Sequence, residues 1–455
     1  MSRAAALADS LRLTAPAVVI VACGSALIAA SRDGLLVSRW WWTVFAAAIV
    51  VAAGVVAVSR PAGDRLVIPI AATLAALGAV TIARLEAPLL DNPDVPFDLL
   101  ARHLAATGAG VLACVAVALF VRPVTLRRYK YTWLALTLLL LALTILFGQE
   151  IRGARLWLRI GPVQIQPSEL LRITLVAWLA GYLDERRDLI APDPFAGRFR
   201  APPVPYLAPI AGIGALSVAA LVLQNDLGTS LLLFGIALGM VYAATGAAVY
   251  VWVGLAGFAG LAALAAQSAP RLGVRVQNWA DPWRDPLASG YQQAQSDYAL
   301  SAGGVFGTGL GNGMPGAIPD VHTDFVLSAI GEELGLVGTV AILLLLLLFA
   351  WRGLAIGLAA PDGFERLLAV GLASGIALQG LLIAGGVIRL IPLTGLTLPF
   401  VSFGGSSSVA NWIIAGLLVS VSRTAGQRRP GPSVAARGAL PYTPGRSQHA
   451  GGWPT

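Results

Sequence analysis

The sequence predicts an all-α protein that crosses a membrane about twelve times. Of its 455 residues, 57% are hydrophobic and 12% are charged, whereas soluble proteins carry about 25% charged residues. The apolar runs are as long as helices that cross roughly 30 Å of hydrocarbon, and they lack the alternation of a barrel strand. These observations exclude a soluble multidomain fold and favour a helical bundle in lipid.

The expected helices are justified in chain order by apolar runs that end at polar or basic loops. We place them at about residues 13–31, 40–59, 66–84, 103–121, 131–148, 168–183, 204–223, 229–245, 247–267, 325–351, 367–388 and 407–422. The first run opens this series without a convincing cleavage site, which favours an uncleaved helix over a signal peptide. Cys23 and Cys114 lie inside apolar runs, which indicates packing residues.

Basic residues in the short loops predict the orientation, because such residues accumulate on the cytoplasmic side. If residues 1–12 are cytoplasmic, the same side receives Arg60, Arg65, Arg122, Arg127, Arg128, Lys130, Arg186, Arg187, Arg198, Arg200, Arg352 and Arg366. Both termini are then cytoplasmic, and the tail 423–455, rich in Pro, Gly, Ser and Arg, is expected to be disordered. The net charge of +8 therefore reflects membrane topology, and no basic stripe indicates nucleic acid.

One loop on the opposite side breaks this charge rule. It carries Arg152, Arg155 and Arg159. The next helix starts at about residue 167, and Arg172 follows inside that helix. Guanidinium groups and a helix N-terminus suit phosphate oxygens, so one interpretation is a lipid diphosphate site. The other is that the arginines reach the membrane interface while Glu169 pairs with Arg172 at i, i+3.

The segment 268–324 on that side is too long and polar for a connector. Asp281 and Asp285 each precede a proline in it. Such pairs are typical turn devices, although an aspartate there is also free to act as a base. The glycine-rich run 303–313 resembles a phosphate cradle only superficially, because it has no preceding strand and no P-loop lysine, so a close backbone approach is expected.

Further polar residues lie near or within the spans: Asp226, Asp324, Glu332, Glu333, Gln379 and Arg389. Ionisable groups at such depths face a cavity or a partner. The structural alternative is that Asp226 caps a helix and that Glu332 or Glu333 pairs with an arginine. The run 404–408, GGSSS, suits close helix packing. The sequence contains no cluster with zinc-ligand spacing and no GxSxG elbow.

Five segments stand out by their joint order over about residues 130–422. They are GARLWLRIGPVQIQPSELLRI, QNDLGTS, DPLASGYQQAQSDYALSAGGVFGTGLGNG, TDFVLSAIGEELGLVG and PLTGLTLPFVSFGGSSS. Together they resemble the signature blocks of the SEDS family, which comprises RodA and FtsW, and the first block and the layout are most similar to RodA-type proteins of actinobacteria. The sequence departs from the family pattern at Leu156, where an arginine is usual before Trp157, and at Arg172, where a lysine is usual.

The resemblance implies ten core helices, and two more precede them here. The expected organisation is a cytoplasmic N-terminus 1–12, N-terminal helices 13–121, a core 122–422 that contains the extracellular loop 268–324, and the tail 423–455. It implies a peptidoglycan glycosyltransferase of the bacterial plasma membrane that joins lipid II into β-1,4 glycan strands, releases undecaprenyl diphosphate, and works with a class B penicillin-binding protein during elongation. An FtsW-type division polymerase, a lipid II flippase or transporter, and a non-catalytic scaffold are the alternatives.

The resemblance also implies the residues of the site. Asp285 is the expected catalytic base, which takes the proton of the acceptor sugar's 4-hydroxyl. The residues expected to contact substrate are Arg155, Arg159, Glu169, Arg172, Gln224, Asp226, Tyr291, Gln295, Ser296, Thr323, Asp324, Glu332, Arg389 and Ser406. No dedicated metal ligands are expected, and a divalent Mg or Mn ion is the one cofactor that the diphosphate chemistry would use.

Overall fold

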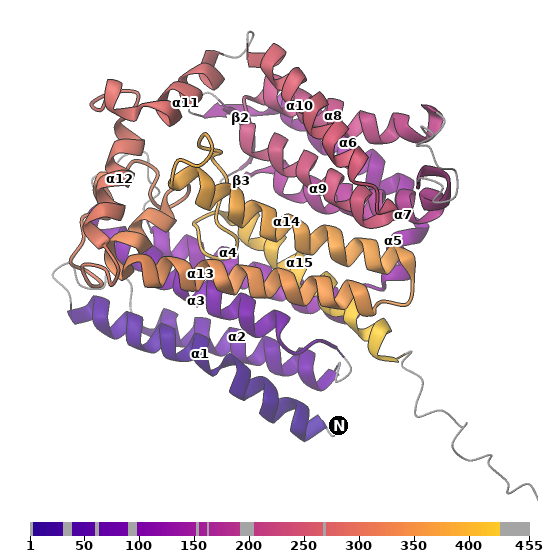
Figure 1. Cartoon of the computed structure of the whole chain (residues 1–455). Coiled ribbons are helices and arrows are strands. Elements are labelled where there is room, and N and C mark those ends of the chain that lie inside the picture. The colour runs from indigo at the N-terminus through magenta and orange to yellow at the C-terminus, as the bar shows by residue number, and fades with distance from the viewer. Residues whose placement is uncertain are drawn as a thin grey trace, which may run out of the picture.

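The computed structural model describes residues 3–30, 39–59, 63–89, 98–151, 154–161, 163–191, 204–266 and 270–427. Helices occupy all of the expected spans (Figure 1). Among the described helices, nine are long and apolar enough to cross a membrane, and two further apolar helices, Ala208–Gln224 and Ala248–Ala263, are shorter. The chain is therefore a multi-pass α-helical membrane protein, which confirms the predicted fold class.

The N-terminal helices form a layer along one flank of the bundle. α1 (Arg3–Ala30) packs against α2 (Arg39–Ser59) and α3 (Val67–Glu86), and α2 packs against α4 (Leu99–Phe120). Small alanine side chains fill much of α3, and nearly all of this helix is buried. The first two helices thus cover α3 and α4 from the side. A short 3-10 helix, η1 (Ala87–Leu89), follows α3.

The next part of the chain contains the three described strands. After α5 (Pro123–Arg128) and α6 (Lys130–Phe147), the chain forms an antiparallel sheet in the order β1-β2-β3, and α7 (Pro167–Ile190) follows. The strands are β1 (Gln149–Ile151), β2 (Ala154–Ile160) and β3 (Val163–Ile165).

The loop expected between the fifth and sixth spans contains this sheet, whose strands were not predicted. Arg155, Trp157 and Arg159 alternate with Leu156 and Leu158, which is the two-residue period of a strand. The alternation covers so few residues that the sequence alone does not distinguish a strand from a loop here. The sheet therefore presents both arginines on one face, since alternate residues of a strand point the same way.

Three helices then pass back and forth through tight connections: α8 (Val204–Gln224), α9 (Leu227–Thr245) and α10 (Ala248–Ala266). Gly246 ends α9 with φ 69°, a left-handed conformation that glycine adopts without a steric cost.

The long segment 268–324 is structured over its described residues. It contains α11 (Pro270–Ala280), η2 (Pro282–Arg284), α12 (Tyr291–Gly303) and η3 (Pro315–Ala317). Figure 1 shows α11 and α12 together at one end of the bundle, which we call the α12 end, and the N-terminus with the end of the last helix at the other, which we call the termini end.

The last three helices complete the core: α13 (Val326–Ala359), α14 (Gly363–Val387) and α15 (Gly405–Gln427). α13 is longer than the expected span and is kinked at Gly335, where φ is 69°. α13 packs against α14, and α15 packs against α4. Because α15 reaches Gln427, the predicted tail begins as helix. The remainder of the tail lies outside the described residues, as do Arg60, Arg152, Arg198 and Arg200.

Candidate active site

Asp285 lies in an exposed turn between η2 and α12 at the α12 end. Its Oδ2 accepts a hydrogen bond from the Ser289 backbone N–H at 3.0 Å, and its carbonyl accepts from Gly290 at 2.9 Å. Oδ1 accepts no hydrogen bond from the described residues. The aspartate therefore both builds the turn and keeps one carboxylate oxygen open to solvent, as a general base requires.

Glycine is required at the end of this turn. A Cβ on Gly290 would lie 3.1 Å from the Asp285 carbonyl oxygen and would also collide with the Pro282 carbonyl. Asn278 of α11 donates from Nδ2 to the Ser289 carbonyl at 2.6 Å, which fixes the turn to the preceding helix. The position of Asp285 is thus set by contacts on both sides.

Asp281, the other aspartate before a proline, has a local structural task. Its Oδ1 accepts from the Trp283 backbone N–H at 3.0 Å and so caps η2. Trp283 in turn meets the ring of Tyr298 edge-on, with centroids 5.3 Å apart. Asp281 is therefore a natural comparison for Asp285.

Arg389 joins the end of α14 to α11 and α12. Its Nε lies 3.2 Å from Asp297 Oδ2, and its carbonyl accepts from Trp279 Nε1 at 2.9 Å. Burial raises the pKa of Asp297, while Arg389 and a hydrogen bond from Gln293 act in the opposite direction. Arg389 thus lies beside the candidate site and already forms an ion pair with Asp297.

A buried polar cluster lies where α7, α14 and α15 meet. Arg172 forms an ion pair with Glu169 at 3.0 Å and donates to Asn411 Oδ1 at 2.6 Å and to Gln379 Oε1. Gln379 donates onward to the Thr397 carbonyl at 2.7 Å. The i, i+3 pair of Glu169 and Arg172 is confirmed, and the guanidinium is buried among partners from this chain.

Arg275 of α11 is a further candidate, which the sequence analysis missed. Its Nη1 lies 3.4 Å from the carbonyl oxygens of Leu393 and Thr394. A Cβ on Gly395 would lie 3.6 Å from Asp324 Oδ2 and 3.7 Å from Arg275 Nη2, so both charged groups lie over this glycine. The signal was available, because a basic residue in the loop 268–324 breaks the same charge rule as Arg155.

Asp226 lies between α8 and α9. Its Oδ1 accepts from the Thr229 backbone N–H at 2.9 Å, which confirms that it caps α9. It is close enough to Arg275 and Glu169 to interact with both electrostatically. Asp226 is thus a buried helix cap in the neighbourhood of both charged side chains.

The glycine-rich run 303–313 wraps the start of α13. Backbone N–H groups of Thr308 and Gly309 donate to the carbonyls of Glu332 and Glu333 at 2.9 Å and 3.0 Å. Gly307, with φ 82°, leaves no space for a Cβ next to the Glu333 carbonyl. The predicted close backbone approach is confirmed, and its partner is α13.

The side chains of Glu332 and Glu333, on α13, also fix the end of this run. Glu332 Oε1 accepts from the Met314 backbone N–H at 2.8 Å. Glu333 forms a buried ion pair with Arg84 at 2.9 Å, and Arg84 also donates to the Gly313 carbonyl at 3.2 Å. The structural alternative for Glu333, an arginine partner, is therefore confirmed.

Arg155 and Arg159 lie exposed on β2. Arg155 has only a loose contact with Glu150, at 3.9 Å, and Arg159 Nε donates to the Gly161 carbonyl at 3.3 Å. Beyond β3, the Gln166 backbone N–H donates to Ser406 Oγ at 2.9 Å. The sheet is thus attached to the start of α15 with its arginines available to an anion.

Of the remaining residues expected to contact substrate, some lie in the core and others nearer the surface. Ser296 Oγ lies 2.7 Å from Ser328 Oγ in the core, Gln224 is buried, and the Thr323 carbonyl accepts from Ser402 Oγ at 2.6 Å. Tyr291 and Gln295 are half-buried on α12.

Within the described residues, no group of three or more His, Cys, Asp or Glu side chains could hold a metal ion. Mg²⁺ is commonly bound by one or two carboxylates together with substrate phosphates, so a divalent ion would have to share the substrate's own oxygens.

These features define a polytopic helical membrane protein with an exposed carboxylate and arginines at one end of its bundle. The profile of the cell cycle protein family of FtsW, RodA and SpoVE matches residues 64–427. The chain belongs to this family. The match starts before the signature blocks at 130–422 and leaves α1 and α2 outside it.

Named relatives cover most of the chain. It is 40% identical to peptidoglycan glycosyltransferase RodA of Mycobacterium tuberculosis, over 81% of this chain and 80% of that protein. It is 35% identical to stage V sporulation protein E of Bacillus subtilis, over 79% of this chain and 97% of that protein.

Two solved structures share the fold. One, from a study of polymerization and crosslinking by a peptidoglycan synthase complex, matches with a TM-score of 0.64 and 31% identity, over 80% of this chain and 98% of that chain. The crystal structure of the rod shape determining protein RodA of Thermus thermophilus matches with a TM-score of 0.56 and 30% identity, over 79% and 97%.

Proposed function

We propose that this chain is a peptidoglycan glycosyltransferase that polymerises lipid II into β-1,4 glycan strands. The observation that carries the proposal is the Asp285 carboxylate, which is held by Ser289 through one oxygen and open to solvent through the other. The chain belongs to a family in which relatives at 40% identity carry the name peptidoglycan glycosyltransferase RodA.

In the proposed reaction, Asp285 accepts the proton of the acceptor sugar's 4-hydroxyl. That oxygen attacks the anomeric carbon of the lipid-linked strand while the carbon–oxygen bond to the diphosphate breaks, and the anomeric centre is inverted. Undecaprenyl diphosphate leaves with the bonding electron pair. A general base of this kind contributes about 10²–10⁴ in rate.

Positive charge for the leaving diphosphate is available on two elements at the α12 end. Arg155 and Arg159 are exposed on β2, and Arg275 on α11 is half-buried beside Asp324. Guanidinium groups bind phosphate oxygens in pairs and remain charged at every physiological pH. By contrast, Arg172 and Arg389 already form ion pairs within the chain, so we propose that they position the site rather than receive the diphosphate.

We also propose the topology and the setting of this reaction. The α12 end would face outward from a bacterial plasma membrane, and both termini would be cytoplasmic, since the basic residues Arg122, Arg127 and Arg128 lie towards the termini end. A class B penicillin-binding protein is the proposed partner, and elongation the proposed process. Labelling of single cysteines placed at Ser289 and at Thr424 with a membrane-impermeant reagent in intact cells tests the orientation: only the first should react.

The activity is tested with purified protein, its penicillin-binding protein and labelled lipid II. Asp285→Asn keeps an acceptor oxygen for Ser289 but cannot take a proton, so polymer formation should fall by about 10²–10⁴. Asp281→Asn is the matched control, because it changes the neighbouring Asp-Pro aspartate without removing the proposed base.

Both variants should unfold at the temperature of the unchanged protein. Full polymerisation by Asp285→Asn, or an equal loss in Asp281→Asn, would contradict the proposed mechanism. Lipid II movement across vesicles without any polymer would favour a flippase instead.

A further inference from the structure

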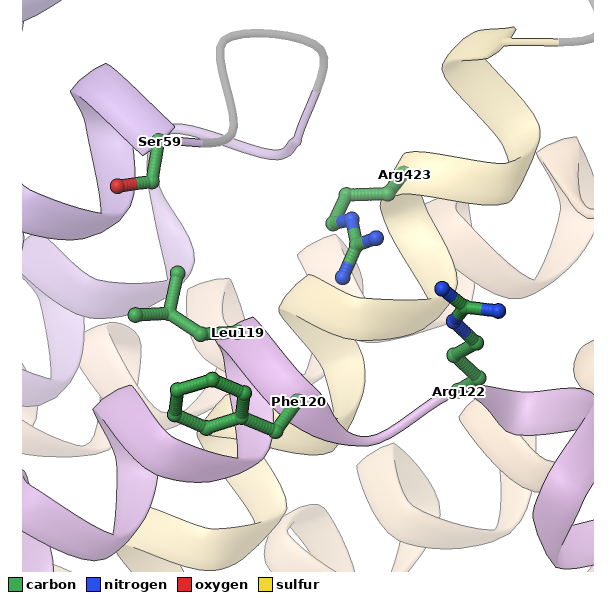
Figure 2. Close-up of a pocket in the computed structure, with 5 residues that line it drawn as sticks. All are labelled: Ser59, Leu119, Phe120, Arg122 and Arg423. Atoms are coloured by element: carbon green, nitrogen blue, oxygen red, sulfur yellow. The ribbon is translucent and has the colours of Figure 1, made fainter.

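A pocket of about 450 Å³ opens at the termini end, far from Asp285. It is lined by Ser59 at the end of α2, Leu119 and Phe120 at the end of α4, and Arg122 and Arg423. Figure 2 shows the two guanidinium groups on one side of the pocket and the other three side chains on the opposite side. Its volume lies in the usual range for small-ligand sites, about 300–1,000 Å³.

Among the described residues, two arginines and no carboxylate line this pocket, so its charge is positive. Arg423 is half-buried, and its Nη1 donates to the Ala118 carbonyl at 3.0 Å, which holds the guanidinium at the end of α4. Arg122 is exposed and forms no ion pair with a carboxylate in the described part of the chain.

Nearby basic side chains at this end form ion pairs with carboxylates. Arg127 forms ion pairs with Asp184 and Asp362 at 3.4 Å and 3.1 Å, and Lys130 pairs with Glu185. The pocket thus brings two arginines together in a region where carboxylates form ion pairs with the neighbouring basic side chains. An anion is the ligand that this arrangement fits.

Apart from Ser59, the opposite wall of the pocket is apolar. Phe120 is 80% exposed at the last residue of α4, where the membrane-spanning helix ends, and Leu119 lies beside it. A free phosphate ion would use only the arginines and the Ser59 hydroxyl. An amphiphile with a phosphate and an acyl chain would use both walls at the depth where lipid headgroups lie.

We propose that this pocket binds the headgroup phosphate of an anionic phospholipid, with Arg122 and Arg423 on the phosphate oxygens and Leu119 and Phe120 along the acyl chain. The site links the ends of α2, α4 and α15. Because α2 lies outside the family match, the lipid would fasten an added helix to the family core. This inference does not rest on glycosyltransferase activity.

Native mass spectrometry of the full chain, released from nanodiscs of mixed phosphatidylglycerol and phosphatidylcholine, tests the proposal. The unchanged protein should retain phosphatidylglycerol in preference to phosphatidylcholine. Arg122→Ala should bind phosphatidylglycerol about tenfold more weakly, as expected for the loss of a charge-assisted hydrogen bond. Arg423→Gln should behave alike, and the exposed position of Arg122 keeps the test valid if Arg423→Gln fails to fold.

Arg128→Ala is the matched control, because Arg128 is an exposed arginine on α5 that does not line the pocket. Equal losses in Arg122→Ala and Arg128→Ala, or no preference for phosphatidylglycerol, would overturn the proposal. Inorganic phosphate and Phe120→Ser separate the two sources of phosphate. Displacement of the lipid by inorganic phosphate, with unchanged binding in Phe120→Ser, would assign the pocket to free phosphate and would also overturn the lipid site.

Discussion

The buried ion pair between Arg84 of α3 and Glu333 of α13 gives the sharpest stability prediction. The two charged groups lie 2.9 Å apart, and each side chain is 4% exposed. Replacing Arg84 with methionine would leave the Glu333 carboxylate buried without its cation. Removal of one member of such a pair costs about 3–5 kcal/mol. The contact of Arg84 with the Gly313 carbonyl would be lost as well.

Two further variants show whether burial sets this cost. Arg65 and Asp9 form an ion pair of similar length, 2.7 Å, but their side chains are 41% and 38% exposed. Arg65→Met should therefore cost less than about 1 kcal/mol, because water screens an exposed pair. The double variant Arg84→Met/Glu333→Leu should be more stable than Arg84→Met alone, because it also removes the carboxylate that the single variant leaves buried without its cation.

Equilibrium unfolding in mixed micelles of mild detergent and dodecyl sulfate, followed by circular dichroism, measures the free energy of unfolding for each protein. The reasoning would be refuted if Arg84→Met cost no more than Arg65→Met. It would also be refuted if the double variant were less stable than Arg84→Met.

Three other outcomes follow from the same structure. Gly307→Ala should lose more than about 1–2 kcal/mol in the same titration, because φ there is 82° and a Cβ would also collide with the Glu333 carbonyl oxygen. Gly212→Ala on α8, where a Cβ meets open space, should lose nothing. Arg172→Lys should lose about 1.5–3 kcal/mol, because a lysine cannot replace both buried guanidinium contacts; a neutral result would show that the cluster is not stabilising. The raised pKa of Asp297 means that the native state holds its proton more tightly than the unfolded state, so stability falls as pH rises from the ordinary aspartate range through the raised pKa. The thermal unfolding temperature, measured at several pH values across that interval, should fall as pH rises. Asp297→Asn should remove this dependence on pH.

The helical spans were predictable because each is a long apolar run, and length alone separates such a run from a strand. Local partners were also predictable: Asp226 caps the helix that follows it, and Glu169 pairs with Arg172 one turn away. These contacts depend on spacing within one element, which the sequence displays directly.

Contacts between distant helices were not predictable from one sequence. Gln379 and Asn411 lie 207 and 239 residues from Arg172, and no local pattern connects them to it. The sheet at residues 149–165 was not predicted because its strands are too short to show a clear alternation. Arg275 was missed because functional residues in its loop were sought among the aspartates and the glycine-rich run, although its charge gave the same signal as that of Arg155.

The layer formed by α1 and α2 limits where another membrane protein can dock. A single-span partner needs a strip of helix that faces lipid. The span of α3 is 89% buried, whereas the spans of α1, α6 and α13 are only 28%, 17% and 28% buried. A transmembrane partner should therefore seat on the flank of α1, α6 or α13, and the two added helices replace α3 as the outer surface on their side of the bundle.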